Sequence, residues 1–109
     1  MSEVLKEIEI NKLIPFRKKL FELYESERYD DFKSNIEKYG IITPIIIRLL
    51  KEEDKAKFSK EDIAKYPNAE YEIIAGHNRV NVARDLKMEC ISAIIKEYAS
   101  DEEAELDVV

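Results

Sequence analysis

A short turn in the second half of the chain carries the residue types best suited to chemistry. An apolar run ends there at Gly76, one of only two glycines, and His77, Asn78 and Arg79 follow directly. A strand that turns through glycine into a helix presents free backbone N–H groups and the positive end of the helix dipole, which favour an anion. An arginine in the first helical turn adds a donor pair that matches phosphate. The turn therefore predicts an anion-binding site; the alternative is a plain β–α turn with a surface arginine.

Two further segments are expected to meet this turn at one end of a sheet. Thr43 and Pro44 precede a strongly apolar run, and Arg17 follows a proline in the first connection of the chain. If the neighbouring strands pair, these loops converge with the Gly76 turn. Such an arrangement would hold a polyphosphate and a base.

Other kinds of site have little support in the sequence. His77 is the only histidine, and no H-x-x-x-H, C-x-x-C, EF-hand, P-loop or G-x-G-x-x-G pattern occurs. We therefore predict no metal site. The single cysteine, Cys90, lies in an apolar run, so we expect a buried, unreactive thiol and no internal disulfide. A reducing cytoplasm is the expected compartment.

The composition limits the size of the domain and its partners. The chain has 109 residues and a net charge of −6, with 24 acidic and 18 basic side chains. This length suits one domain with a single core. Binding of duplex DNA by this chain alone is disfavoured, because neutralisation of phosphates needs a basic surface. A small anionic ligand needs only a local positive pocket. No apolar run is long enough for a membrane span, and no signal peptide is expected.

One helix is expected over residues 27–39. Its apolar side chains are spaced three, four and three residues apart and form one stripe; they are Tyr29, Phe32, Ile36 and Tyr39. Ser26 is the expected N-cap, and Gly40 occupies the position where a left-handed residue ends a helix.

Four strands are expected from apolar and β-branched runs, at residues 4–10, 45–50, 71–75 and 90–95. The second of these should be covered on both faces. Residues 13–16 are expected to form a buried connection, because Pro15 prevents strand pairing there. Residues 18–25 form either a helical turn or a packed loop.

Two more helices complete the expected fold. One follows the Gly76 turn over residues 77–86, and the other begins at a capping box formed by Ser100 and Glu103. The charged residues 51–68 form a surface excursion with a short helix near residues 59–65. The order of elements predicts an α+β fold, with a small mixed four-stranded sheet packed by about three helices.

Three segments of the sequence resemble a known family. They are residues 40–48 (GIITPIIIR), 71–84 (YEIIAGHNRVNVAR) and 100–104 (SDEEA). In this order and spacing they resemble the N-terminal domain of ParB-type proteins, over nearly the whole chain. The nearest similarity is to ParB-like domains of plasmids and mobile elements in Gram-positive bacteria. Sulfiredoxin has the same fold and a similar G-x-x-R turn.

The resemblance implies a nucleotide-binding regulatory domain. ParB domains bind CTP with Mg²⁺, and binding closes a dimer into a clamp on DNA during plasmid or chromosome partition. The residues implied around the nucleotide are Gly76, His77, Asn78, Arg79, Thr43, Pro44 and Arg17. Gly76 and Arg79 would contact phosphates, and Arg17 would lie in the loop that covers the pocket. DNA sequences are read by a helix-turn-helix domain, so we expect residues 1–109 to be a single N-terminal domain cut before that domain.

Several departures from the family pattern bear on activity. The usual motif is G-E-R-R-x-R, whereas this chain has Gly76-His77-Asn78-Arg79-Val80-Asn81. The glutamate and two of the three arginines are absent, so at most a weak CTPase is expected. A further asparagine- and arginine-containing helix of the family would follow Val109. The catalytic cysteine of sulfiredoxin is replaced as well, so sulfinic-acid reductase activity is not expected.

Two other classes of function stay open. One is a nucleotide-dependent enzyme on the same fold, either a small-molecule kinase or a ParB-like nuclease, with Glu72 or Asp85 as its base. The other is an interaction role in which the Gly76 turn binds nothing. In the first case nucleotide turnover would depend on one of these carboxylates.

Overall fold

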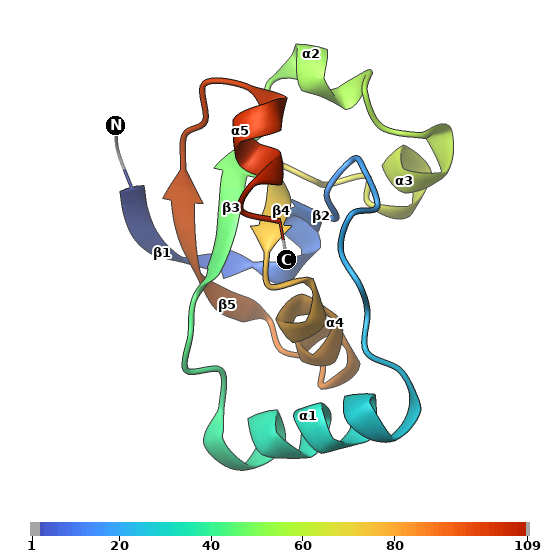
Figure 1. Ribbon diagram of the computed structural model, residues 1–109, viewed down its shortest axis with the longest axis vertical. Helices are drawn as coiled ribbons and strands as arrows, with labels where there is room; N and C mark the ends of the chain where they lie inside the picture. Colours follow the sequence, from blue (N-terminus) through green and yellow to red (C-terminus); the bar gives the residue numbers. More distant parts are fainter. Residues whose placement is uncertain (1–2, 109) are drawn as a thin grey trace.

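A computed structural model describes residues 3–108, which form one mixed β-sheet with helices packed around it (Figure 1). The strands are β1 (Glu3–Glu9), β2 (Leu13–Ile14), β3 (Ile45–Leu49), β4 (Tyr71–Ala75) and β5 (Cys90–Lys96). Their order across the sheet is β1-β5-β3-β4-β2. β5 pairs antiparallel with β1 and parallel with β3, whereas β4 pairs antiparallel with β3 and parallel with β2. The α+β class is confirmed, with five strands instead of the expected four.

Five α-helices and one short 3-10 helix surround the described sheet. They are η1 (Ile10–Lys12), α1 (Ser26–Tyr39), α2 (Glu52–Lys55), α3 (Lys60–Lys65), α4 (His77–Asp85) and α5 (Asp101–Glu105). The three helices predicted from periodicity and caps correspond to α1, α4 and α5. The charged segment 51–68 contains two short helices, α2 and α3, where one helix near residues 59–65 was predicted. Ser59 Oγ and Ser100 Oγ each accept a backbone N–H three residues on, as their cap positions require.

The predicted connection around Pro15 is wrong in one respect. Leu13 and Ile14 form β2 and pair with Tyr71 and Glu72. Pro15 directly follows this strand, so its missing N–H interrupts no pairing. The N-cap prediction is also wrong, because Ser26 is the first residue of α1 and Glu25 is the N-cap, without a side-chain hydrogen bond.

The expected burial of Cys90 is wrong as well. Its side chain is exposed at the first position of β5. The buried positions of this strand are Ile91 and Ala93, and alternate residues of a strand point to opposite faces. The side chain of Cys90 therefore points to the face of the sheet opposite to that of Ile91 and Ala93.

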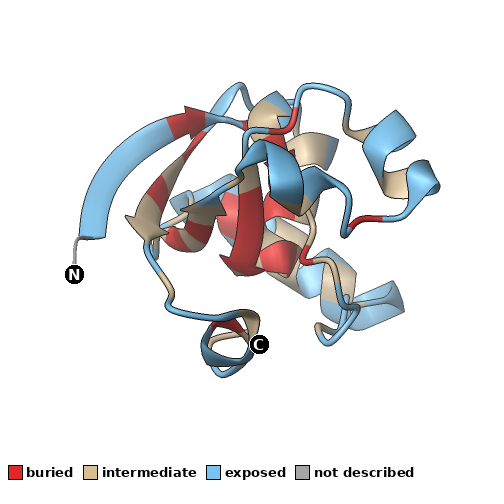
Figure 2. Ribbon diagram, turned by 90° about the horizontal axis from the view of Figure 1, so that it is seen from above, coloured by how far each residue is buried: buried red, intermediate tan, exposed pale blue. Residues whose placement is uncertain are grey.

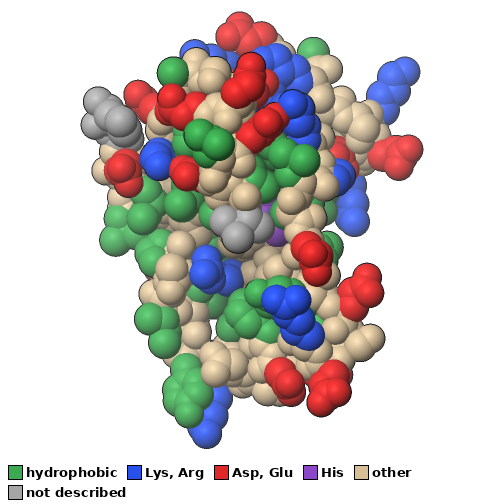
Figure 3. All heavy atoms as spheres, viewed as in Figure 1, with side chains coloured by type: hydrophobic (Ala, Val, Ile, Leu, Met, Phe, Trp, Pro, Cys, Tyr) green, Lys and Arg blue, Asp and Glu red, His purple; other side chains and the backbone are tan. Residues whose placement is uncertain are grey.

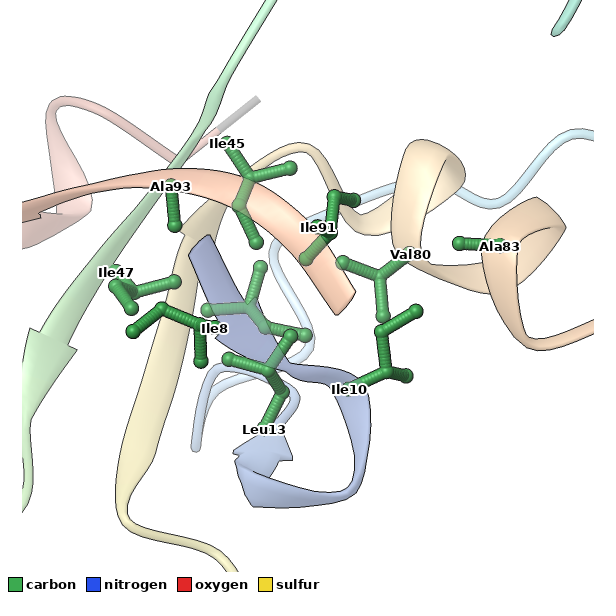
Figure 4. Packing of buried hydrophobic residues seen from close by; sticks show 10 residues of the cluster. Ile8, Ile10, Leu13, Ile45, Ile47, Val80, Ala83, Ile91 and Ala93 are labelled. Carbon is green, nitrogen blue, oxygen red and sulfur yellow. The ribbon is translucent and has the colours of Figure 1, made fainter. Parts of the chain in front are cut away.

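The sequences of β3 and β4 are almost continuously apolar because both faces of these strands are covered by core residues. Ile45, Ile47 and Ile73 pack with Val80 and Ala83 of α4 on one face (Figure 4). On the other face, the alternate residues of the same strands pack with Phe16 and with Ala104 of α5. The two central strands are thus covered on both sides, as Figure 2 shows by the buried segments along the middle of the sheet.

Helix α1 lies at the periphery, separated from the sheet by α4 (Figure 1). Only Ile36 of its 14 residues is buried. The helix ends at Gly40, whose positive φ of 77° favours glycine as expected, although its ψ of −178° is extended and not that of the left-handed helix. Within residues 3–108, no helix has the length and apolar character needed to span a membrane. The peripheral position of α1 leaves room for a cavity between it and the start of α4.

A candidate anion-binding site at the start of helix α4

The turn between β4 and α4 requires glycine for two reasons. Gly76 is the N-cap of α4 and has φ 102° and ψ 25°, in the left-handed region. A Cβ atom at this position would lie 2.5 Å from Ile45 Cγ2, and 3.3 Å from Arg79 Nη1. The chain therefore packs closely against β3, and the guanidinium group of Arg79 folds back over the turn.

A cavity of about 420 Å³ opens beside this turn. Its walls come from β4 and α4 on one side and from α1 with the preceding loop on the other; they are Glu22, Tyr24, Arg28, Phe32, Ala75, Gly76, His77, Asn78 and Arg79. This volume lies in the range of small-molecule sites. The turn is therefore open to a ligand and is not filled by side chains.

A smaller hollow of about 230 Å³ is also lined by Arg79. Thr43 lines it, together with Gly40 and the two isoleucines between them. Pro44 follows as a half-buried residue ahead of β3. The structure therefore places the Thr43 loop next to Arg79, the arginine of the Gly76 turn.

Arg79 is the residue of the turn with the most capacity to bind. Its side chain is half-buried, and no carboxylate or other acceptor pairs with it within residues 3–108. An unpaired guanidinium group is a strong donor for phosphate oxygens. The first backbone N–H groups of the nine-residue helix α4 add to this positive region.

Asn78 uses its side chain to hold a loop. Its Oδ1 accepts the backbone N–H of Tyr24 at 2.8 Å, and its Nδ2 donates to the carbonyl oxygen of Glu22 at 2.9 Å. These two bonds attach the segment before α1 to the first turn of α4. Asn78 thereby forms part of the wall of the cavity.

His77 is buried, with 4 % of its surface exposed. Its Nε2 accepts the backbone N–H of Phe16 at 3.1 Å, and its ring stacks on Phe21 with centroids 3.6 Å apart. Burial lowers the pKa of His77 to about 3, and the charge of Lys19 acts in the same direction. The imidazole is therefore neutral at pH 7, with its proton on Nδ1, which has no acceptor within the described chain.

Arg17 lies in a different cluster. Its guanidinium and backbone N–H bind the carboxylate of Glu72, which is fully buried and also accepts from Arg48 Nε at 2.7 Å. Asp101 and Asp54 complete the set with ion pairs to Arg17 at 3.5 and 3.7 Å. Arg17 is therefore committed to this cluster and is not among the described residues that line the cavity.

The surface charges are mixed. In the view of Figure 3, acidic and basic side chains are interspersed over α2, α5 and α1, and no continuous basic surface appears on this face. The anion-binding capacity of the site is therefore local, in agreement with the net charge of −6.

Comparison with known proteins assigns the family. The profile of the ParB N-terminal domain matches residues 1–109. The chain belongs to the ParB N-terminal domain family.

Relatives of this ParB domain include larger proteins. The nucleoid occlusion protein of Bacillus subtilis is 29% identical over 108 residues, which cover 99% of this chain and 33% of that protein. The protein of the same name from Bacillus pumilus is 28% identical over 109 residues, covering 100% and 32%. The chain thus spans about a third of the length of these curated relatives.

Solved structures show the same fold. C-terminally truncated chromosome-partitioning protein ParB of Caulobacter crescentus, complexed with CTP-gamma-S, superposes with a TM-score of 0.71 at 19% identity, covering 94% of this chain and 49% of that one. A free serine kinase in complex with AMP gives a TM-score of 0.60 at 20% identity, covering 89% and 32%. At these identities the likeness establishes the fold of the ParB domain alone.

Neither carboxylate considered as a base lines the cavity of this ParB domain. Glu72 is enclosed by Arg17 and Arg48, and Asp85 accepts the hydroxyl of Tyr29 at the far end of α4. Glu22 is the only acidic residue among the described cavity-lining residues. Residues 3–108 contain no group of three histidine, cysteine or carboxylate side chains that could hold a metal ion.

Sequence reasoning missed three residues that line the cavity of the ParB domain, namely Tyr24, Arg28 and Phe32. Arg28 and Phe32 are four residues apart and therefore lie on one face of α1. This spacing is the only feature of the sequence that could have indicated that they line the same cavity. Phe32 belongs to the apolar stripe expected of the helix over residues 27–39, and no motif marks Arg28.

Proposed function

We propose that this ParB domain binds a nucleoside triphosphate, CTP with Mg²⁺, in the cavity between α1 and α4. The observation that carries the proposal is the unpaired guanidinium of Arg79 beside the start of α4 and a cavity of about 420 Å³. The residues present suit a phosphate chain, because Arg79 and the first N–H groups of the helix are all donors.

The choice of CTP rests on family resemblance and on the relative that was crystallised with CTP-gamma-S. Thr43, in the hollow next to Arg79, is the proposed border of the pocket on the side of the base or ribose. Since residues 3–108 hold no acidic metal-binding group, we propose that Mg²⁺ enters with the phosphates. Bound Mg²⁺ would supply charge neutralisation between phosphate oxygens.

Removing the guanidinium of Arg79 should weaken nucleotide binding. Arg79→Ala is expected to raise the Kd for CTP by a factor of about 10 to 150, because a charge-assisted hydrogen bond contributes about 1.5–3 kcal/mol. The measurement is calorimetric titration with CTP, ATP and GTP, each with and without Mg²⁺.

A matched control is Lys60→Ala, which removes one positive charge from the exposed start of α3 and should leave the Kd unchanged. Equal affinities for Arg79→Ala and Lys60→Ala would contradict the role of Arg79. If the unmodified domain binds none of the three nucleotides, the proposed function itself is wrong.

The wider role follows from the relatives. We propose that the domain regulates a cytoplasmic DNA-partition or nucleoid-occlusion protein, in which nucleotide binding controls association of two copies. DNA would be contacted by regions outside this chain, since the net charge of −6 disfavours direct binding. Whether the protein belongs to a plasmid or a chromosome system stays a prediction.

The enzymatic alternative has less support than the binding role. Both proposed bases lie outside the cavity, and Glu22, which lines it, is exposed. We therefore propose a nucleotide switch with at most slow CTP hydrolysis. Turnover that persists after Glu22→Gln but disappears with Asp85→Asn, a change at an exposed carboxylate, would favour the enzyme instead.

A further inference from the structure

Two arginines have no acceptor among the described residues, and both line the same cavity. The sequence contains five arginines. Three are held by oxygen atoms of the protein, and these are Arg17, Arg48 and Arg84. Arg28 and Arg79 have neither an ion pair nor a hydrogen-bond acceptor within residues 3–108, yet they face the cavity from α1 and from α4.

Neither the exposed Arg28 nor the half-buried Arg79 pairs with a carboxylate of the described residues, although the protein is acidic. Acidic side chains outnumber basic ones by 24 to 18, so a long arginine side chain has many carboxylates to pair with. Glu22, an exposed residue, is the only acidic residue among those that line the cavity. His77, which is 4 % exposed, lines the cavity as well and leaves Nδ1 without an acceptor. Donors thus exceed acceptors around this space, which suits a ligand of several negative charges.

Arg28 is held in position by the start of α4. Its guanidinium carbon lies 4.0 Å from the centre of the Tyr24 ring, which meets Phe32 edge-on at 5.2 Å. The backbone N–H of Tyr24 is in turn bound by Asn78 Oδ1. The turn that carries Arg79 therefore also fixes, through Asn78 and Tyr24, the arginine on the opposite wall.

We propose that Arg28 is the second guanidinium group of the phosphate site, so that the phosphate chain bridges α1 and α4 between Arg28 and Arg79. This proposal rests on the proposed function and adds a ligand-binding residue outside the G-x-x-R turn. The family motif has arginines where this chain has Asn78 and Asn81. Arg28, which comes from helix α1, would supply a positive charge in place of these missing arginines. Because α1 has a single buried residue and is joined to α4 mainly by polar contacts of Tyr29 and Asn78, an anion held between the two helices would add to their attachment.

Calorimetric titration with CTP–Mg²⁺ tests this proposal. Arg28→Ala should raise the Kd about tenfold, as expected for loss of one charge-assisted contact made by an exposed side chain. The loss should be larger for CTP than for CMP, because the triphosphate carries more negative charge and more oxygen acceptors for the two guanidinium groups. Arg28→Lys should restore part of the affinity. Lys38→Ala, which removes an exposed charge at the other end of α1, is the matched control and should change nothing.

A second arm uses inorganic tripolyphosphate, which lacks a base. If both arginine variants weaken its binding while the unmodified domain binds no nucleotide, the arginine pair is supported and the nucleotide proposal fails. If the domain binds CTP and Arg28→Ala matches Lys38→Ala, the bridging role of Arg28 is overturned while the role of Arg79 stands. In an Asn78→Ala background the effect of Arg28→Ala should shrink; a full tenfold effect there would overturn the positioning by Tyr24.

Discussion

Glu72→Ala is expected to lower the free energy of unfolding by about 3–5 kcal/mol. The carboxylate is fully buried and accepts the Arg17 backbone N–H at 2.8 Å and Arg48 Nε at 2.7 Å, besides the Arg17 guanidinium. Without it, two guanidinium groups with 5 % and 13 % exposed side chains lose their shared buried partner. Asp101 also pairs with both arginines, but its side chain is more exposed, so it balances only part of their buried positive charge. Urea denaturation followed by circular dichroism gives the measurement.

The matched control for this change lies two residues earlier in the chain. Glu70→Ala removes an exposed carboxylate that pairs with Lys12 at 3.4 Å, and it should cost about 0–1 kcal/mol. A Glu72→Leu variant that also carries Arg17→Met and Arg48→Met should recover most of the lost stability, because no buried charge is then unpaired. Similar losses for Glu70→Ala and Glu72→Ala would refute the structural importance of the buried cluster.

Acidification should destabilise the domain through His77 by about 3 kcal/mol between about pH 7 and pH 4. Burial lowers the pKa of this imidazole from 6.5 to about 3 in the folded protein. Between these values the unfolded chain binds a proton that the folded chain does not bind, so stability rises with pH. The contribution of His77 is thus complete above about pH 6.5 and is lost as the pH falls towards about 3.

The comparison with His77→Gln isolates this effect. Glutamine keeps an acceptor for the Phe16 N–H but does not titrate, whereas the carboxylates that also titrate are shared by both proteins. The difference in unfolding free energy between the two should therefore shrink by about 1.4 kcal/mol per pH unit below about pH 6. Parallel stability curves from pH 7 to pH 4 would show that His77 is not held in its neutral form.

The local elements were predictable where short-range patterns decide them. The apolar spacing of α1, the glycine that ends it and the caps at Ser59 and Ser100 follow from helix geometry. The Gly76 turn was equally readable, because the left-handed backbone there suits glycine. Each of these features depends on residues fewer than five positions apart.

The roles of individual site residues needed the tertiary structure. The family resemblance placed His77 and Asn78 in the same nucleotide-binding turn as Arg79. In the structure their side chains hold Phe16, Glu22 and Tyr24, which are 54 to 61 residues away in the chain. Arg28 acquires its position over the cavity through Tyr24. No local pattern encodes such partners.

By itself, the sequence determined the α+β class, the family and the position of the glycine turn, since these depend on periodicity, backbone sterics and a motif at fixed spacing. Only the tertiary structure decided which charges stay unpaired. Arg17 and Arg48 look in the sequence much like Arg28 and Arg79, but the sheet brings the first two against buried Glu72. The pairing of β3 with β4, and not residue type, decides that Arg17 and Arg48 bind a buried carboxylate. Arg28 and Arg79 remain beside the cavity.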